Sequence, residues 1–146
     1  FELALACDYL FASTAARFAD THARVGILPG WGLSQKLTRI IGINRAREMS
    51  FAGHFIDAHR AEAWGLVNRV CTPETLLDET LESAAQVADG DRKAVVALKA
   101  LMNDGSKQSL GDALVLEGER GNAFAKTVDY SEMGERLAAL RKRAAK

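Results

Sequence analysis

The chain has 146 residues, of which 48% are hydrophobic and 26% charged, a composition typical of an ordinary globular protein that buries its own core. Nineteen basic residues balance nineteen acidic ones, which argues against a nucleic-acid partner. No stretch approaches the ~20 apolar residues that a membrane-spanning helix needs. We therefore expect a cytoplasmic protein with no nucleic-acid partner and no membrane partner.

The two cysteines, Cys7 and Cys71, lie far apart, and each stands in an apolar run. Neither has the Cys or His spacing of a metal site, and two cysteines do not make a disulfide framework. We expect two reduced, buried thiols and no metal site.

The chain opens inside an apolar segment, residues 1–6, without an initiator Met and without a polar lead-in. A natural protein seldom starts in this way. We therefore expect the sequence to be part of a longer protein.

Short strand and helix patterns alternate over the first 40 residues. Residues 3–7 suit a helical turn, and residues 9–12 and 17–19 favour short strands. A loop is predicted over 20–32, because it contains Gly26, Pro29, Gly30 and Gly32. A helix is predicted over 33–41, ended by Gly42, with one apolar face made of Leu33, Leu37, Ile40 and Ile41.

Two more helices and a strand are predicted before residue 72. Asn44 is the expected cap of a helix that runs to residue 51 or 52, and Asp57 that of a helix over 58–64, ended by Gly65. Residues 66–70 alternate like a strand. Strands alternating with helices indicate an α/β arrangement.

After residue 72 the pattern is only helical. Thr72 is a good N-cap, and Pro73 suits a first helical position. Helices are predicted over 73–88, 92–102, 110–126 and 132–145, the last three capped by Asp91, Ser109 and Ser131. We place a boundary at residue 72, between an α/β part (1–72) and an all-helical part (73–146).

Four motifs follow one another along the α/β part. They are Phe1-Glu2-Leu3-Ala4-Leu5-Ala6-Cys7-Asp8; Arg17-Phe18-Ala19 followed by Gly26-Ile27-Leu28-Pro29-Gly30-Trp31-Gly32; Gln35-Lys36-Leu37 with Arg39 and Gly42; and Asp57-Ala58, Ala61, Ala63 and Gly65-Leu66-Val67 followed by Val70. In this order they resemble the motifs of the crotonase superfamily, the enoyl-CoA hydratase/isomerase family. The chain resembles the C-terminal half of such a protein.

This resemblance implies a fold and a partner. Residues 1–72 would be the latter part of a crotonase-type ββα spiral core, and 73–146 a helical region that mediates trimer formation. The expected assembly is a homotrimer or a dimer of trimers, which would bury leucines such as Leu76, Leu77, Leu81, Leu110, Leu114 and Leu137 between subunits. The substrate would be an acyl-CoA thioester, with no cofactor other than the CoA that is part of the substrate.

The resemblance also implies an oxyanion hole made of two backbone N–H groups, which stabilise negative charge on the thioester oxygen. One of them would lie at the N-terminus of a helix that begins just before Phe1. The glycine run that supplies this N–H group, and the other half of the hole, would then lie outside this sequence.

Glu2 stands where the family has the first of two catalytic carboxylates. A carboxylate in that position accepts a proton from water. The alternative is that Glu2 is only an acid placed favourably in the first turn of a helix. Because Phe1 and residues 3–8 also match the motif, we interpret Glu2 as the catalytic base.

His22 stands where the family has its second glutamate, and the nearest acid is Asp20, two residues earlier. Imidazole is a general acid or base near neutral pH, with a reference pKa of about 6.5. Replacement of the second carboxylate by His22 is therefore one interpretation. The other is that His22 is a loop residue, in a protein that lacks hydratase activity or uses Glu2 alone.

Substrate contacts are expected from Leu28, Pro29, Gly30 and Trp31, in the loop before the helix at 33–41. Trp31 is unusual in a loop where the family often has small residues. Its side chain either narrows the acyl pocket or packs on the following helix.

The favoured function is the addition of water to a 2-enoyl-CoA, or its reverse, with Glu2 as base and His22 as acid. Two alternatives remain. One is double-bond isomerisation of an enoyl-CoA, for which Glu2 alone would suffice. The other is a non-catalytic subunit that binds acyl-CoA or serves assembly.

Overall fold

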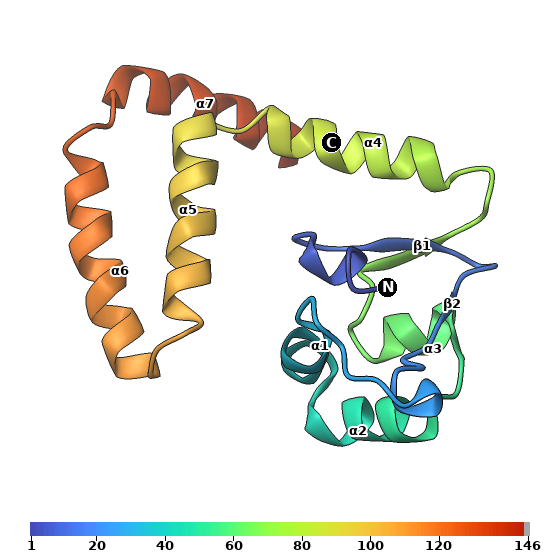
Figure 1. Cartoon of the computed structure of the whole chain (residues 1–146). Coiled ribbons are helices and arrows are strands. Elements are labelled where there is room, and N and C mark those ends of the chain that lie inside the picture. Colours follow the sequence, from blue (N-terminus) through green and yellow to red (C-terminus); the bar gives the residue numbers. More distant parts are fainter. Residues whose placement is uncertain (145–146) are drawn as a thin grey trace. The chain divides into compact units, whose positions relative to one another are not determined.

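The structure is a computed structural model that describes residues 1–144 (Figure 1). It has two compact units, one of residues 1–86 and one from residue 87 on. Within the described chain, every strand precedes residue 72 and only helices follow it. The elements in order are η1 (Ala4–Ala6), β1 (Phe11–Ser13), β2 (Arg17–Phe18), η2 (Ala23–Val25), α1 (Leu33–Ile41), α2 (Ile43–Ala52), β3 (Ile56–Asp57), α3 (Ala58–Ala63), β4 (Arg69–Cys71), α4 (Leu76–Ala88), α5 (Arg92–Gly105), α6 (Leu110–Ala125) and α7 (Tyr130–Ala144).

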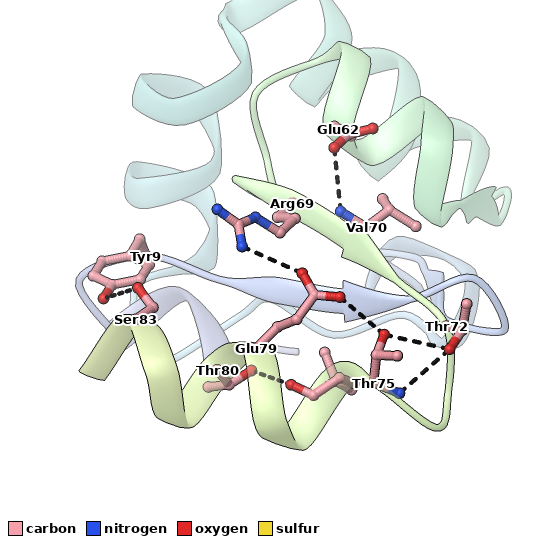
Figure 2. Close-up of polar contacts among 10 residues, drawn as sticks. Tyr9, Glu62, Arg69, Val70, Thr72, Thr75, Glu79, Thr80 and Ser83 are labelled. Carbon is pink, nitrogen blue, oxygen red and sulfur yellow. Dashed lines mark hydrogen bonds and ion pairs between the residues drawn. The ribbon is translucent and has the colours of Figure 1, made fainter. Parts of the chain in front are cut away.

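The strands of the first unit form two pairs. β1 and β4 are parallel, with Phe11 opposite Arg69 and Ser13 opposite Cys71. A parallel pair needs a long crossover, and here it contains α1, α2 and α3. β2 and β3 pair antiparallel. Helices α1, α2 and α3 lie on one side of the β1–β4 pair, and the first part of α4 lies on the other (Figures 1 and 2).

The core of this unit is built around α1. Leu33, Leu37 and Ile41, spaced four residues apart, are buried on one face of this helix. Each buried side chain of this kind contributes roughly 1.5–3 kcal/mol. The bounds predicted for the helix are confirmed, but Ile40 was wrongly placed on the buried face. It lies at the edge of the stripe and is 42% exposed.

A single glycine connects α1 to α2. Gly42 has φ +82°, and its carbonyl accepts the first hydrogen bond of α2, from the N–H of Ala46. α2 therefore begins at Ile43, and the prediction that Asn44 caps it is wrong. No side chain caps this helix, because Gly42 occupies the capping position.

The predicted strand over 66–70 begins later than expected, as β4. The N–H groups of Leu66 and Val67 both donate to the carbonyl of Ala61 and so close the end of α3. They are therefore not free for a strand ladder, and pairing starts only at Arg69. The expected cap of α3 is confirmed, since the Asp57 carboxylate accepts from the N–H of Arg60 at 2.8 Å.

A polar network fixes the start of α4 to the strands (Figure 2). Glu79 accepts hydrogen bonds from Arg69 of β4 (3.2 Å) and from the hydroxyl of Thr75 (2.9 Å), and Tyr9 is hydrogen-bonded to Ser83 (2.9 Å). α4 begins three residues later than the predicted Pro73, at Leu76, because residues 72–75 form a turn first.

The prediction of two buried thiols is half right. Cys71 is buried, but Cys7 is exposed, and both are free. Cys7 follows the short helix η1, and the residue of that apolar run that enters the core is Leu5, which is 4% exposed.

The second unit contains α5, α6 and α7. α5 and α6 pack on one another, and their predicted caps are confirmed: Asp91 accepts from the N–H of Ala94, and Ser109 from that of Asp112. α7 begins two residues before the predicted Glu132.

Ser131 is not the cap of α7. The carboxylate of Asp129 accepts from the backbone N–H of Ser131 at 2.9 Å, and also from its hydroxyl at 2.6 Å. These hydrogen bonds and one from the backbone of Glu132 lower the pKa of Asp129. The predicted end of the helix at Ala145 lies outside the described residues, and the boundary at residue 72 stays a prediction.

Replacing Asp57 by Ala is expected to lower the free energy of unfolding by about 1 kcal/mol, because the N–H of Arg60 loses its acceptor. Asp57→Asn keeps a side-chain acceptor and serves as the matched control. Urea unfolding followed by circular dichroism compares them. Equal stability of the Ala variant and the parent would contradict the capping role.

Candidate active site

Glu2 is held by the N-terminal end of α1. Its Oε1 accepts hydrogen bonds from the backbone N–H groups of Trp31 (3.0 Å) and Leu33 (3.3 Å). Leu33 is the first residue of α1, and the first N–H groups of a helix have no partner inside it. The carboxylate thus caps a helix that begins 31 residues later in the chain, and its second oxygen remains available.

Gly32 makes this contact possible. It lies between the two N–H donors, with φ +96°, a backbone conformation that strains any residue with a side chain. Gly32 offers no side-chain cap to α1. An acceptor therefore has to come from elsewhere, and Glu2 supplies it.

His22 lies opposite the free oxygen of Glu2. Its Nε2 is 3.7 Å from Glu2 Oε2, and its Nδ1 is 2.7 Å from Asp20 Oδ1. The same Asp20 oxygen accepts from the backbone N–H of His22 at 3.2 Å, a local turn typical of aspartate. The three side chains form a row in which the imidazole lies between two carboxylates.

Asp20 is a buried carboxylate, only 4% exposed. Burial by itself raises the pKa of Asp20. Hydrogen bonds from Ser50 and from the ring and backbone N–H of His22 outweigh burial and hold this pKa below its usual value. Asp20 is therefore ionised at neutral pH.

An ionised carboxylate only accepts hydrogen bonds, so the contact between Asp20 and His22 requires the proton to be on Nδ1. In neutral imidazole the lone pair is then on Nε2, which is the nitrogen that points to Glu2. In the imidazolium form, Nε2–H points there. The row thus presents a proton acceptor or a proton donor at one defined position.

A contact with α2 supports the loop that carries His22. Arg24 in η2 donates its Nε–H to the carbonyl of Ala52 at 2.7 Å. Gly53, just beyond, has φ +60°, and a Cβ there would lie 2.5 Å from Arg24 Cγ. The absence of a side chain at Gly53 lets Arg24 approach the backbone.

Two members of this row, Glu2 and His22, line a pocket of about 270 Å³. Of the residues predicted for the site, Glu2, His22 and Trp31 line it, whereas Leu28, Pro29 and Gly30 do not. Trp31 is 75% exposed, so little of its surface packs on α1. The substrate contacts expected from all four loop residues stay predictions. The remaining lining residues are Phe1, Leu3, Ala19, Thr21 and Leu33.

A larger pocket, of about 460 Å³, lies in the helical unit and contains none of the predicted site residues. It is lined in part by Asp91, Phe124, Met133 and Arg136. Asp91 and Arg136 face each other there at 3.3 Å. Over residues 1–144, no group of three or more His, Cys, Asp or Glu side chains is placed to hold a metal ion.

No role was predicted for Asp20, which stood in the sequence only as the acid nearest to His22. The spacing Asp-Thr-His at residues 20–22 could have indicated the contact between Asp20 and His22. An aspartate side chain commonly accepts from the N–H two residues on, which places the two side chains together.

The comparison with known proteins agrees with this architecture. The family model for enoyl-CoA hydratase/isomerase matches residues 1–134. The chain is 49% identical over 124 residues to "Probable enoyl-CoA hydratase 1, peroxisomal" from Arabidopsis thaliana, covering 85% of this chain and 47% of that protein. It is 36% identical over 131 residues to "Short-chain-enoyl-CoA hydratase" from Clostridioides difficile, covering 90% and 84%.

Among solved structures, enoyl-CoA hydratase from Bacillus anthracis superimposes with a TM-score of 0.87 at 31% identity, over 97% of this chain and 54% of that one. The chain belongs to the enoyl-CoA hydratase/isomerase family. It spans about half the length of the Arabidopsis and Bacillus proteins. The predicted crotonase-type fold class is confirmed. None of the helices within residues 1–144 is both long and apolar enough to cross a membrane.

Proposed function

We propose that the complete protein adds water to the double bond of a 2-enoyl-CoA thioester, or catalyses the reverse reaction. The observation that carries this proposal is the pair Glu2 and His22, which face each other at 3.7 Å in a pocket of about 270 Å³. Hydration needs one group to take a proton from water and one to give a proton to carbon. Relatives named enoyl-CoA hydratase support the substrate class.

Glu2 acts as the base in this proposal. Its Oε1 is occupied by two backbone N–H groups, so Oε2 is the oxygen that accepts the proton of water. The water oxygen then bonds to C3 of the substrate. The electron pair of the C2–C3 double bond moves toward the thioester, whose oxygen becomes negatively charged.

His22 acts as the acid. In the imidazolium form it gives the Nε2 proton to C2, which restores the thioester carbonyl and leaves neutral imidazole. Asp20, ionised at neutral pH, accepts from Nδ1–H and keeps Nε2 directed toward Glu2. After release of product, the proton on Glu2 returns to Nε2 of His22 and both groups regain their starting states. Glu2 and His22 transfer only protons in this scheme, and CoA enters as part of the substrate.

The remaining parts of the proposal rest on the resemblance. The oxyanion hole would come from residues outside this sequence. The loop of Leu28, Pro29, Gly30 and Trp31 would contact the acyl chain, with Trp31 at the edge of the pocket narrowing it. The cytoplasmic location stays a prediction.

We also propose that the complete protein is a trimer or a dimer of trimers. The helices after residue 75 expose large apolar side chains, and surfaces of this kind usually mark an interface between proteins. Leu76 is half-buried, and the exposed leucines among those predicted for the interface are Leu77, Leu81, Leu110, Leu114 and Leu137.

Glu2→Gln in the complete protein is expected to lower the rate of crotonyl-CoA hydration by about 10²–10⁴-fold, the usual contribution of a positioned base. The amide oxygen of the new side chain still caps α1, so folding is retained while the base is lost. Glu62→Gln is the matched control, because Glu62 accepts from the N–H of Val70 away from the pocket. Parent rates in the Glu2→Gln variant would show that Glu2 is not the base.

His22→Ala is expected to lower hydration strongly, whereas His22→Glu retains measurable activity. A carboxyl group placed between two carboxylates is held protonated and is therefore able to donate. In the parent, activity is expected to fall as rising pH removes the imidazolium proton. Product analysis with crotonyl-CoA and with a 3-enoyl-CoA measures hydration and isomerisation side by side.

Parent rates in the His22→Ala variant at every pH would remove His22 from the chemistry. The assay with the 3-enoyl-CoA would then decide between an isomerase that uses Glu2 alone and a non-catalytic subunit.

Light scattering of the complete protein is expected to give the mass of three or six subunits. Leu77→Lys and Leu114→Lys should shift the mass towards the monomer, because each buries a charge in the proposed interface. A monomer in the parent protein would contradict the assembly.

A further inference from the structure

We infer that Asp20 is a positioning residue, which holds the His22 imidazole in one orientation, with the proton of the neutral ring on Nδ1 and with Nε2 toward Glu2. This inference rests on the proposed function of the same site. It concerns a residue outside the pocket, since Asp20 is absent from the pocket lining and is only 4% exposed.

The first support is geometric. Asp20 Oδ1 lies 2.7 Å from His22 Nδ1 and also accepts from the His22 backbone N–H at 3.2 Å. Two contacts to one residue restrain both the rotation of the ring and the turn that carries it. A lone histidine in an exposed loop has several rotamers available, and only some would direct Nε2 to Glu2.

The second support is the buried charge. A carboxylate that is 4% exposed is costly unless it is paired and hydrogen-bonded. Ser50 supplies one hydrogen bond and His22 supplies the others. Rotation of the ring away from Asp20 would take one of these hydrogen bonds from a buried charge, so the aspartate holds the ring with Nδ1–H toward itself.

The charged groups around the imidazole ring of His22 bear on this inference. The titratable groups in contact with it are Asp20, from its own loop, and Glu2, from the N-terminal segment. Charged side chains on the neighbouring elements have other contacts: Arg24 with Ala52, Arg39 with Gln35, Glu48 near His54, and Arg45 over Trp64, while Lys36 lies beside Gly32.

A spectroscopic experiment on the complete protein tests the inference without an activity assay. Histidine labelled with ¹³C and ¹⁵N is titrated by NMR, and the His22 signals are assigned by their loss in His22→Gln. We expect neutral His22 in the parent to carry its proton on Nδ1. A parent in which the neutral ring carries the proton on Nε2 would overturn the inference before any Asp20 variant is made.

Asp20→Asn then removes the charge while keeping the shape. We expect part of the neutral His22 population to carry its proton on Nε2 instead of Nδ1, and kcat to fall by about 10- to 100-fold, the low end of the contribution of a positioned acid, with KM unchanged. Asp57→Asn, the same change at a helix cap in the same unit, should move neither. An unchanged tautomer of His22 and an unchanged kcat in the Asp20→Asn variant would refute the inference.

A double-mutant comparison separates positioning from a general effect on the fold. If Asp20 acts through His22, Asp20→Asn causes no further loss of activity in a His22→Gln background. An equal loss in both backgrounds would assign Asp20 a structural role only. If the parent does not hydrate crotonyl-CoA, the proposed function fails, and the tautomer of His22 in the parent and in Asp20→Asn still decides the role of Asp20.

Discussion

The site depends on one interaction, the capping of α1 by the carboxylate of Glu2. A helix that starts after a glycine with φ +96° has free N–H groups and no side chain of its own to satisfy them. The N-terminal segment provides the acceptor, so the same hydrogen bonds that complete α1 also fix the orientation of Glu2. Because Leu33 and Leu37 anchor α1 in the core, the rigidity of the core is transmitted to the carboxylate.

The row of Asp20, His22 and Glu2 handles charge differently from the pair of carboxylates that the family resemblance implies. Two neighbouring carboxylates repel each other, and one of them must hold a proton to relieve the repulsion. In this chain an imidazole stands between the two carboxylates, 3.7 Å from Glu2 and 2.7 Å from Asp20. The two carboxylates are therefore not direct neighbours, and neither has to hold a proton to relieve repulsion by the other.

The elements and the site differ in how well the sequence predicts them. The bounds of α1 were predicted correctly because its apolar face and its terminal glycine are local signals. β4 was placed too early, since the N–H groups of Leu66 and Val67 are used by α3, which no alternation pattern reveals. The role of Asp20 was missed although its contact with His22 is local. The capping of α1 by Glu2 joins positions 31 residues apart, and no pattern in either segment indicates it.

The contacts of the site join residues at different separations along the chain, and this separation affects the order in which they form during folding. Asp20 and His22 are two residues apart, whereas Glu2 must close a loop of 31 residues to reach Leu33, and β1 pairs with β4 across 58 residues. The entropy lost on closing a loop grows with its length, and local contacts form sooner. A refolding chain therefore orients the imidazole on Asp20 before the carboxylate of Glu2 reaches α1. The complete row of three side chains forms only after the long-range contacts close.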